Sequence, residues 1–250
     1  MLSKREYLVP KWSVPRSVQA VFTTRQGGAS KGVFESLNLS YSVGDDQEHV
    51  SKNRELLSEI LPSSPFWVTQ IHSNKLVKAE DSTPTTQADA LYTNKQRTVC
   101  GIMTADCLPV LITNTVGDEV AAAHAGWKGL AAGILENTIK QFSAAAKNLV
   151  VQLGPAISQK NYEVGEDLVQ RFLELDHGYQ KYFRPHAQGK YSADLCGIAT
   201  HQLKQLNVNQ IYGVNYCTYE QSHQFFSHRR TKPTGRMAAM IWLDDSQKES

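Results

Sequence analysis

The sequence contains few cysteines, and none of them are paired at close spacing. The four cysteines are Cys100, Cys107, Cys196 and Cys217, and they form no Cys-x-x-Cys motif. In a reducing compartment free thiols persist, so no disulfide framework is expected. Each thiol is therefore predicted to be either a small buried side chain or a chemically active group.

Long hydrophobic runs are missing as well. No window approaches the roughly 18 unbroken apolar residues that a membrane-spanning helix needs. Residues 1–17 also lack the apolar block of a signal peptide. The formal net charge is +2, which indicates neither nucleic acid nor an anionic membrane as a partner. We therefore expect a cytoplasmic protein that acts on a small molecule.

The sequence does contain enough apolar material for a large core. Of its 250 residues, 41% are hydrophobic, which suits one large domain or two tightly joined subdomains. Strand-like runs are predicted at 18–24, 66–73, 99–113, 119–126, 148–154, 211–218 and 238–243. Helical spacing of apolar residues is predicted at 48–61, 129–145, 166–175 and 193–206. This mixture predicts an α/β fold with helices outside the sheets.

Three of the predicted strands end in a thiol or an imidazole. Cys107 precedes Pro109, and proline cannot donate to a sheet ladder, so the strand is expected to end or bulge there. His124 follows "VAAA" and precedes "AGWKG", which predicts a strand-to-helix corner. His72 ends the run "FWVTQIHS" and is followed by turn-forming residues.

Two imidazoles and a thiolate are a good ligand set for Zn²⁺, with a fourth position left for water or substrate. However, 35 residues separate His72 from Cys107, and 17 more separate Cys107 from His124. Such spacings are much less specific than a short zinc-finger pattern. Each of the three residues also fits an ordinary core or surface position, so composition and spacing leave both interpretations open.

Further motifs occur along the chain in one order: "TTRQGGAS", "SLNLSYSVGDD", "QIHSN", "ADALYT", "TADCLPVL", "AAAHAGWKGLAAGILE", "LGPAIS", "YEVG", "CTY", "FFSHRR" and "TGRMAAMIWL". With these blocks the sequence resembles the YfiH-like family, which is also called the laccase-domain or multicopper polyphenol oxidase family. The resemblance covers roughly residues 20–243.

This resemblance implies Zn²⁺ bound by His72, Cys107 and His124. It also implies a four-layer α/β/β/α fold in which two similar subdomains pack as one domain, residues 1–250. The implied activities are purine nucleoside phosphorylase, acting on adenosine, inosine and guanosine, methylthioadenosine phosphorylase, and adenosine deaminase. Older names imply a polyphenol oxidase, which makes copper a second candidate metal, and bacterial members are linked to peptidoglycan synthesis.

Deamination requires an activated water, and a bound Zn²⁺ lowers the pKa of water. Phosphorolysis requires a positioned phosphate, and arginine suits phosphate because its planar fork binds two oxygens. The candidate arginines are Arg25, Arg54, Arg229, Arg230 and Arg236. Arg54 lies in a helical stretch just before the strand that carries His72, so we predict that it approaches the metal and acts in catalysis.

Other residues near the three ligands are candidates for the site. Asp106 is a proton carrier, an acid that orients a metal-bound histidine, or a turn-forming or capping acid beside the site. Together with Cys107 and Arg54 it makes up the predicted catalytic set. Arg25 in the glycine-rich turn, Asn38, and Gln70 on the strand face of His72 are predicted to bind substrate.

Three other functions remain open at this stage. A copper oxidase of phenols is possible because two histidines and one cysteine also form blue-copper sites, but no two histidines here are separated by a single residue as in trinuclear copper clusters. A metal-free hydrolase or deamidase linked to the cell wall would use Cys107 as nucleophile and His124 as its base. A non-catalytic protein that binds a nucleotide or a cell-wall precursor is the third.

Overall fold

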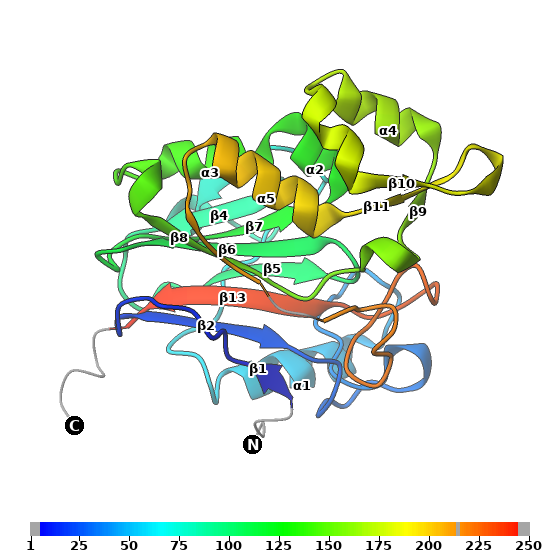
Figure 1. The fold of residues 1–250 in the computed structure, drawn as a ribbon. Helices are drawn as coiled ribbons and strands as arrows, with labels where there is room; N and C mark the ends of the chain where they lie inside the picture. Colours follow the sequence, from blue (N-terminus) through cyan, green and yellow to red (C-terminus); the bar gives the residue numbers. More distant parts are fainter. Residues whose placement is uncertain (1–5, 214–215, 245–250) are drawn as a thin grey trace.

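Two packed β-sheets form the centre of the molecule (Figure 1). The computed structural model describes residues 6–213 and 216–244. The larger sheet has the strand order β12-β8-β6-β7-β4-β3. Its strands are β3 (Leu76–Lys78), β4 (Ala90–Thr93), β6 (Leu108–Asn114), β7 (Val120–Ala125), β8 (Leu149–Leu153) and β12 (Gln210–Tyr212). It is a mixed sheet, because β3–β4 and β8–β12 are parallel and its other pairs are antiparallel.

The second sheet is antiparallel and lies beneath the first, with the order β1-β2-β13-β5. Its strands are β1 (Tyr7–Leu8), β2 (Val18–Thr23), β5 (Cys100–Thr104) and β13 (Met237–Leu243). A small third sheet contains β9 (Glu163–Val164), β10 (Phe183–Pro185) and β11 (Tyr191–Ala193). Short 3-10 helices in the connections are Gly32–Phe34, Ala79–Asp81, Ala146–Asn148, Gln159–Asn161, His177–Tyr182 and Ala187–Gly189.

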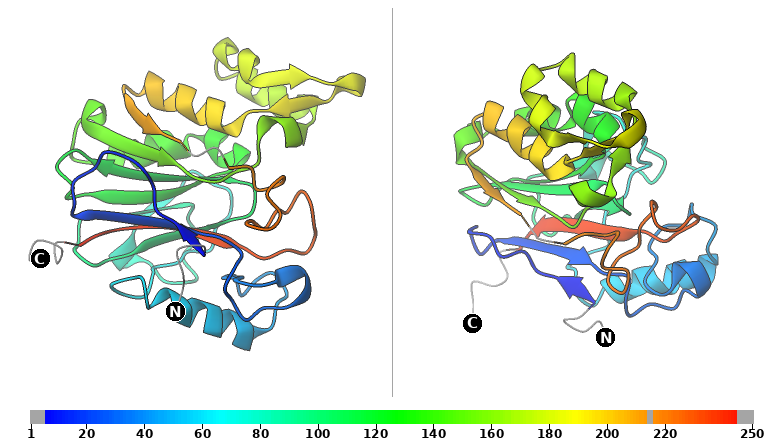
Figure 2. Two further views of the ribbon diagram at one scale, coloured as in Figure 1. Left: turned by 60° about the horizontal axis from the view of Figure 1, so that its bottom comes forward. Right: turned by 45° about the vertical axis from the view of Figure 1, so that its right-hand side comes forward.

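Helices cover both outer faces of the sheet pair (Figure 2). The upper layer contains α2 (Trp127–Ala132), α3 (Ile134–Gln141) and α5 (Leu195–Gln205), with α4 (Glu166–Leu173) beside them. On the opposite side α1 (Gln47–Leu57) lies under the four-stranded sheet. The predicted four-layer α/β/β/α fold is therefore confirmed.

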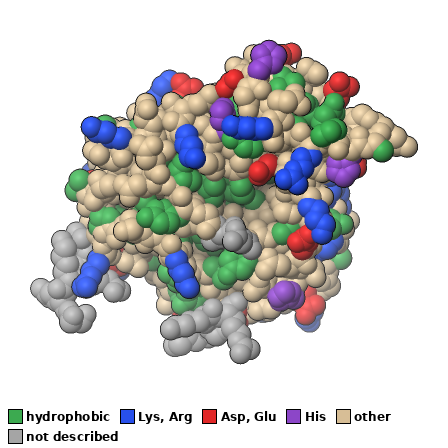
Figure 3. Space-filling model, viewed as in Figure 1, with side chains coloured by type: hydrophobic (Ala, Val, Ile, Leu, Met, Phe, Trp, Pro, Cys, Tyr) green, Lys and Arg blue, Asp and Glu red, His purple; other side chains and the backbone are tan. Residues whose placement is uncertain are grey.

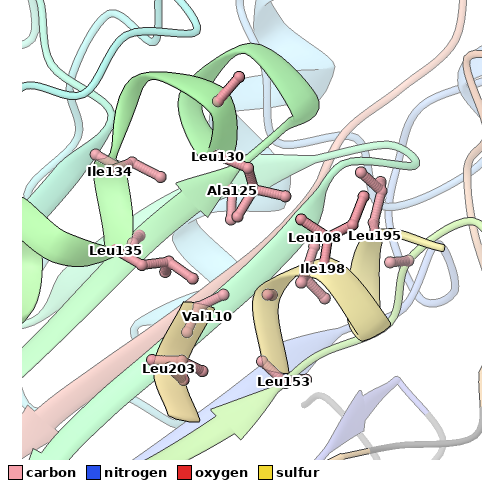
Figure 4. Close-up of a cluster of buried hydrophobic side chains, with 14 of the residues drawn as sticks. Leu108, Val110, Ala125, Leu130, Ile134, Leu135, Leu153, Leu195, Ile198 and Leu203 are labelled. Carbon is pink, nitrogen blue, oxygen red and sulfur yellow. The ribbon is translucent and has the colours of Figure 1, made fainter. Parts of the chain in front are cut away.

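Three apolar clusters fill the three interfaces between the layers. Side chains of successive strand residues point to opposite faces, so Leu108 and Val110 of β6 pack under the upper helices (Figure 4), whereas Leu111 packs between the two sheets. Leu57 of α1 packs with Met240 on the outer face of the lower sheet. Burial on both faces explains why these strands read as unbroken apolar runs.

Two predicted elements are divided in the structure. The run 99–113 becomes β5 and β6, which lie in different sheets, because a turn at 105–107 carries the chain from one sheet to the other. Asp106 occupies this turn with φ of 95°. The helical stretch 129–145 is interrupted at Gly133, whose φ of 88° ends α2 and starts α3.

The predicted strand at 66–73 is wrong. These residues make only isolated bridges, Phe66 with Cys100 and Thr69 with Gln87. The physical reason is that the Gln70 side chain bonds the main chain of Met103 in place of a continuous ladder. The predicted strand 211–218 is reduced to β12, and its residues 214–215 lie outside the described part of the chain.

Within the described ranges, no helix has the length and apolarity needed to traverse a bilayer. Lys, Arg, Asp and Glu side chains are scattered over the face shown in Figure 3. Figures 1 and 2 also show the segment that follows β2 lying beside the segment that precedes β13. Backbone hydrogen bonds join these two segments, among them Leu39 N–H to Arg236 O at 3.2 Å.

Helix α1 begins at a cap that links its stability to pH. Asp46 accepts hydrogen bonds from the backbone N–H groups of Glu48 and His49, and these bonds lower its pKa. The pKa of Asp46 is therefore lower in the folded protein than in the unfolded chain. The ionised cap stabilises the protein fully above about pH 4, and this stabilisation is lost progressively as the pH falls below that value. We expect Asp46→Ala to lower Tm by about 2–4 °C at pH 7, with a smaller gap at pH 3.

Thermal unfolding followed by circular dichroism at the two pH values measures this effect. Asp46→Asn is the matched control because it keeps an accepting oxygen without the charge. A Tm gap of equal size at both pH values would contradict the assignment of Asp46 as a charged cap.

Candidate metal centre and its cavity

The fold brings together one thiol and two imidazoles from distant parts of the sequence. The potential ligand atoms of His72, Cys107 and His124 all lie within 4.8 Å of one another. Cys107 Sγ is 3.9 Å from His72 Nε2, and the two imidazole rings stand edge to face with centroids 4.8 Å apart. Residues that sequence reasoning grouped across long spacings therefore share one place in the structure.

Core packing fixes two members of this cluster. Leu108 pairs with Ala125 across β6 and β7, and both side chains belong to the buried cluster under the helices (Figure 4). Cys107 comes directly before Leu108, and His124 directly before Ala125. The thiol and one imidazole therefore extend from neighbouring ends of a rigid strand pair.

His72 is held differently, by a turn that wraps around a buried carboxylate. Its φ is 59°, in the left-handed region. Asp89 accepts hydrogen bonds from the backbone N–H groups of Ile71 at 3.3 Å, His72 at 3.0 Å and Ser73 at 2.6 Å, and from the Ser73 hydroxyl at 2.7 Å. These bonds stabilise the left-handed turn and direct the His72 ring toward Cys107.

The same carboxylate orients the second imidazole. Asp89 Oδ1 lies 2.9 Å from His124 Nδ1, and the Asp89 carbonyl accepts the His124 backbone N–H at 2.7 Å. Bonding at Nδ1 leaves Nε2 as the ligand atom of the ring. Burial raises the pKa of Asp89, but the hydrogen bonds from His124 and Ser73 outweigh it and hold this pKa at about 2.

The cluster favours a thiolate at neutral pH. Burial by itself raises the pKa of the Cys107 thiol, but the charge on His124 and hydrogen bonds from both imidazoles outweigh it, and the pKa falls to about 6. Burial by itself lowers the pKa of His124, while the Cys107 thiolate and Asp89 raise it. A thiolate is the form of cysteine that binds metals and attacks electrophiles.

Gly126 leaves room for this cluster. A Cβ atom at this position would lie 3.1 Å from Cys107 Sγ and 3.2 Å from His72 Cδ2. Any larger residue would therefore press on two of the three side chains. The donor set, the oriented imidazoles and the open space are together compatible with a bound metal ion, whereas the choice of Zn²⁺ over copper stays a prediction.

The cluster opens into a cavity of about 560 Å³. The cavity is lined by Ser40, Tyr41, Ser42, Val43, Arg54, Trp67, Val68, Thr69, Gln70, His72, Pro84, Met103, Ala105, Cys107, His124, His228 and Arg236. Of these described residues none is acidic, while Arg54 and Arg236 contribute two cations. The cavity is therefore suited to a negatively charged ligand beside the thiol and imidazoles.

Three of the candidate residues outside the cluster line the cavity, namely Arg54, Gln70 and Arg236. Arg54 does so from α1, with Nε donating to the Leu39 carbonyl at 2.9 Å. Gln70 lines it as well, but both its amide atoms bond the main chain of Met103. Gln70 thus shapes the wall of the cavity.

The structure places two predicted substrate-binding residues elsewhere. Asn38 is fully buried, and its amide bonds Ser40, Asp45 and the Arg236 backbone N–H. Arg25 bonds the carbonyls of two distant segments, Glu35 O and Ser222 O. Neither residue lines the cavity, so this arrangement gives both a supporting role in holding segments together.

Asp106 also bonds segments together. Its carboxylate accepts hydrogen bonds from Thr218 Oγ1 at 2.6 Å, Ser227 Oγ at 3.0 Å and the Arg229 backbone N–H at 2.7 Å. These bonds connect the turn that carries Cys107 to the segment that carries His228. Of the interpretations that the sequence left open, this placement favours the turn-forming acid over the proton carrier.

Sequence reasoning missed two residues that the cluster depends on. Asp89 was noticed only within the block "ADALYT", and Gly126 only as one of several small residues after His124. An acidic residue directly before a buried strand was the available signal for Asp89. His228, which was not among the candidates, also lines the cavity.

Comparison with known proteins gives a consistent result. The family described as "Multi-copper polyphenol oxidoreductase laccase" matches residues 19–244. The purine nucleoside phosphorylase of Haemophilus influenzae is 46% identical over 239 residues, covering 94% of this chain and 98% of that protein. Purine nucleoside phosphorylase YfiH of Escherichia coli K12 is 44% identical, with coverage of 94% and 98%.

Solved structures show the same fold. A crystal structure of a Neisseria meningitidis protein of family DUF152 matches with a TM-score of 0.92 and 42% identity, covering 96% of this chain and 99% of that one. The YfiH protein of Bacillus licheniformis matches with a TM-score of 0.85 and 30% identity, covering 91% and 93%.

The geometry predicts that Asp89 controls metal affinity although it is not a ligand. Asp89→Asn keeps the size of the side chain but cannot accept from all its donors, so the His72 turn and the His124 ring lose their shared anchor. We expect affinity for Zn²⁺ to fall about 10–100-fold. Competition with a chromogenic chelator measures this affinity.

Asp81→Asn is the control, since Asp81 is exposed on the 3-10 helix Ala79–Asp81. It should leave the affinity for Zn²⁺ unchanged. Equal affinity of Asp89→Asn and the unmodified protein for Zn²⁺ would show that Asp89 does not position the ligands.

Proposed function

The chain belongs to the multi-copper polyphenol oxidoreductase laccase family, and from this premise we propose that it is a zinc-dependent purine nucleoside phosphorylase. Its proposed substrates are adenosine, inosine, guanosine and methylthioadenosine, together with phosphate. The single observation that carries the proposal is a thiol–imidazole cluster that opens into a cavity with two arginines and no acidic residue among its described lining. Two relatives with 44–46% identity are named purine nucleoside phosphorylase.

Phosphorolysis requires a site that holds the nucleoside and the phosphate in a defined geometry. A phosphate oxygen bonds to the sugar carbon that carries the base, while the bond from that carbon to the purine nitrogen breaks. The purine leaves with the bonding electrons and takes up a proton. Holding both reactants in one cavity makes their reaction effectively unimolecular.

Arg54 and Arg236 are the residues proposed to bind the phosphate. Burial lowers the pKa of both guanidinium groups, but arginine stays charged in proteins. No acidic side chain among the described lining residues competes for their donors. They can therefore fix the anion and neutralise its charge as it approaches the sugar.

His72, Cys107 and His124 are the residues proposed to hold the metal. When bound there, Zn²⁺ would supply Lewis acidity beside the cavity. Asp89 holds His124 in one tautomer by bonding Nδ1, and this keeps the ligand atoms directed toward a common point. We propose hydrolytic deamination of adenosine as a second activity of the same site.

A metal-free Cys107–His124 hydrolase is the alternative that a specific observation favours. The Cys107 thiol lies within 4.8 Å of the ligand nitrogen of His124. The charge on His124 and hydrogen bonds from both imidazoles lower the pKa of Cys107 to about 6, which favours a nucleophilic thiolate without any metal. A polyphenol oxidase with several copper centres has less support. Within residues 6–213 and 216–244, His72, Cys107 and His124 are the one group of three His, Cys, Asp or Glu side chains close enough to share an ion.

Metal removal separates these functions. We expect inosine and phosphate to give hypoxanthine and ribose 1-phosphate, measured by chromatography. Chelation should abolish the reaction and added Zn²⁺ should restore it. Cys107→Ser should reduce turnover by more than about 100-fold, because even residues that only support a ligand contribute 10–100-fold.

Cys196→Ser is the matched control, since Cys196 lies on α5, away from the cavity lining. It should retain turnover. Full activity of the chelated protein would refute the zinc-dependent proposal, and hydrolysis that persists without metal but requires Cys107 would favour the thiol nucleophile.

A further inference from the structure

Arg54 is held by contacts with its Nε atom and with aromatic rings. Its Nε atom donates to the Leu39 carbonyl at 2.9 Å. Its guanidinium carbon lies 4.3 Å from the centre of the Tyr41 ring and 5.1 Å from that of Trp67. All three side chains line the cavity. The position of this cation is thus determined by packing that exists before any ligand arrives.

Each aromatic ring has its own anchor. Trp67 lies against the main chain of β5, because a Cβ atom at Gly101 would come within 2.7 Å of its ring. The Tyr41 hydroxyl lies 3.1 Å from Ser51 Oγ on α1. The two rings are therefore fixed independently of Arg54, and both restrict how its guanidinium can turn.

A guanidinium packed against aromatic rings still offers the N–H groups in its own plane. In Arg54 one of these, on Nε, is already bonded. Among the described residues the two terminal nitrogens have no hydrogen-bond partner. Their N–H groups form the planar fork that binds two oxygens of one anion.

We propose that Tyr41 and Trp67 lock Arg54 into an oxyanion subsite, in which the in-plane edge of the guanidinium binds two oxygens of a phosphate group. This inference rests on the proposed function, which supplies phosphate as a reactant. Tyr41 and Trp67 are positioning residues, since they act through Arg54. Their contribution is to hold a flexible side chain in its binding orientation, so that little entropy is lost when the anion binds.

The main chain of Leu39 joins this subsite to the second cation. Its carbonyl accepts from Arg54 Nε, and its N–H donates to the Arg236 carbonyl. Arg236 Nη1 in turn donates to the carbonyls of Thr234 and Gly235. Both guanidinium groups are therefore held by main-chain carbonyls and line the same cavity, and their two charges match those of a phosphate dianion.

Arg25 shows what distinguishes this subsite from an ordinary packed arginine. It also lies over an aromatic ring, 4.6 Å from the centre of Phe226. However, both Nε and Nη1 of Arg25 are bonded to carbonyls, those of Glu35 and Ser222. Arg25 thus donates its hydrogen bonds to other parts of the protein, whereas the terminal N–H groups of Arg54 are available to bind a ligand.

Calorimetric titration of the zinc-loaded protein with inorganic phosphate tests the proposal. We expect Tyr41→Ala to weaken phosphate binding about 3–10-fold, the size of a lost cation–π contact. Tyr41→Phe should recover most of the affinity, because it keeps the ring over Arg54 and loses only the hydroxyl contact with Ser51. Arg54→Lys should weaken binding about 10-fold or more, since the charge stays but the planar fork is lost. Tyr41 is 40% exposed, so its variants are expected to fold.

Arg171→Lys is the matched control for Arg54→Lys, because Arg171 is an exposed arginine on α4 paired with Glu174. It should not change the Kd for phosphate. In turnover assays Tyr41→Ala should raise KM for phosphate and leave kcat within about twofold, a split that general destabilisation would not produce.

Adenosine monophosphate in a parallel titration identifies where the phosphate group comes from. If Tyr41→Ala weakens the binding of free phosphate, the subsite holds a phosphate co-substrate. If Tyr41→Ala weakens only the binding of adenosine monophosphate, the same subsite holds a phosphate group that the purine ligand carries. Unchanged affinity for both ligands in Tyr41→Ala and Arg54→Lys would overturn the proposal. Since binding is measured without turnover, this result is distinct from a failure to detect phosphorolysis.

Discussion

The site depends on one buried carboxylate. Asp89 has no exposed surface, and it bonds the turn that carries His72 and the ring of His124 at the same time. Burying a charge is costly unless each oxygen is bonded, and here donors from both partners satisfy it. Because one group fixes two of the three cluster side chains, their separation cannot change without leaving that charge unpaired.

The layered fold positions Cys107, which Asp89 does not contact, and it also fixes the backbone of His124. Cys107 and His124 extend from the ends of β6 and β7, whose neighbouring residues Leu108 and Ala125 are locked in the helix-side core. The turn at Asp106 passes the chain between the two sheets, and its carboxylate holds the segment that contributes His228 to the cavity. The cavity thus lies where the two sheets meet several loop segments, and its walls are fixed by different sets of contacts.

Sequence patterns predicted the parts of this structure that depend on local periodicity. The strands near 18–24 and 119–126 and the helix near 48–61 are present because their apolar spacing matches burial within the layers. Local periodicity could not predict most contacts between distant segments, although the strand ends and the family resemblance did group the three cluster side chains. Asp89 and His124 are 35 residues apart in the chain, and the role of Asp89 arises from the directions of backbone N–H groups in a turn that was expected to be a strand. Asn38 likewise looked like a ligand-binding residue, but the cost of burying its amide is met by bonds within the protein.

The central claim is that His72, Cys107 and His124 bind one metal ion in a protein built to hold them together. X-ray absorption at the zinc edge of the purified protein tests this claim most directly. The account predicts one sulfur ligand at about 2.3 Å and nitrogen ligands at about 2.0–2.1 Å, with one zinc per chain. A zinc environment without sulfur, or protein that binds no stoichiometric metal under any loading condition, would contradict it.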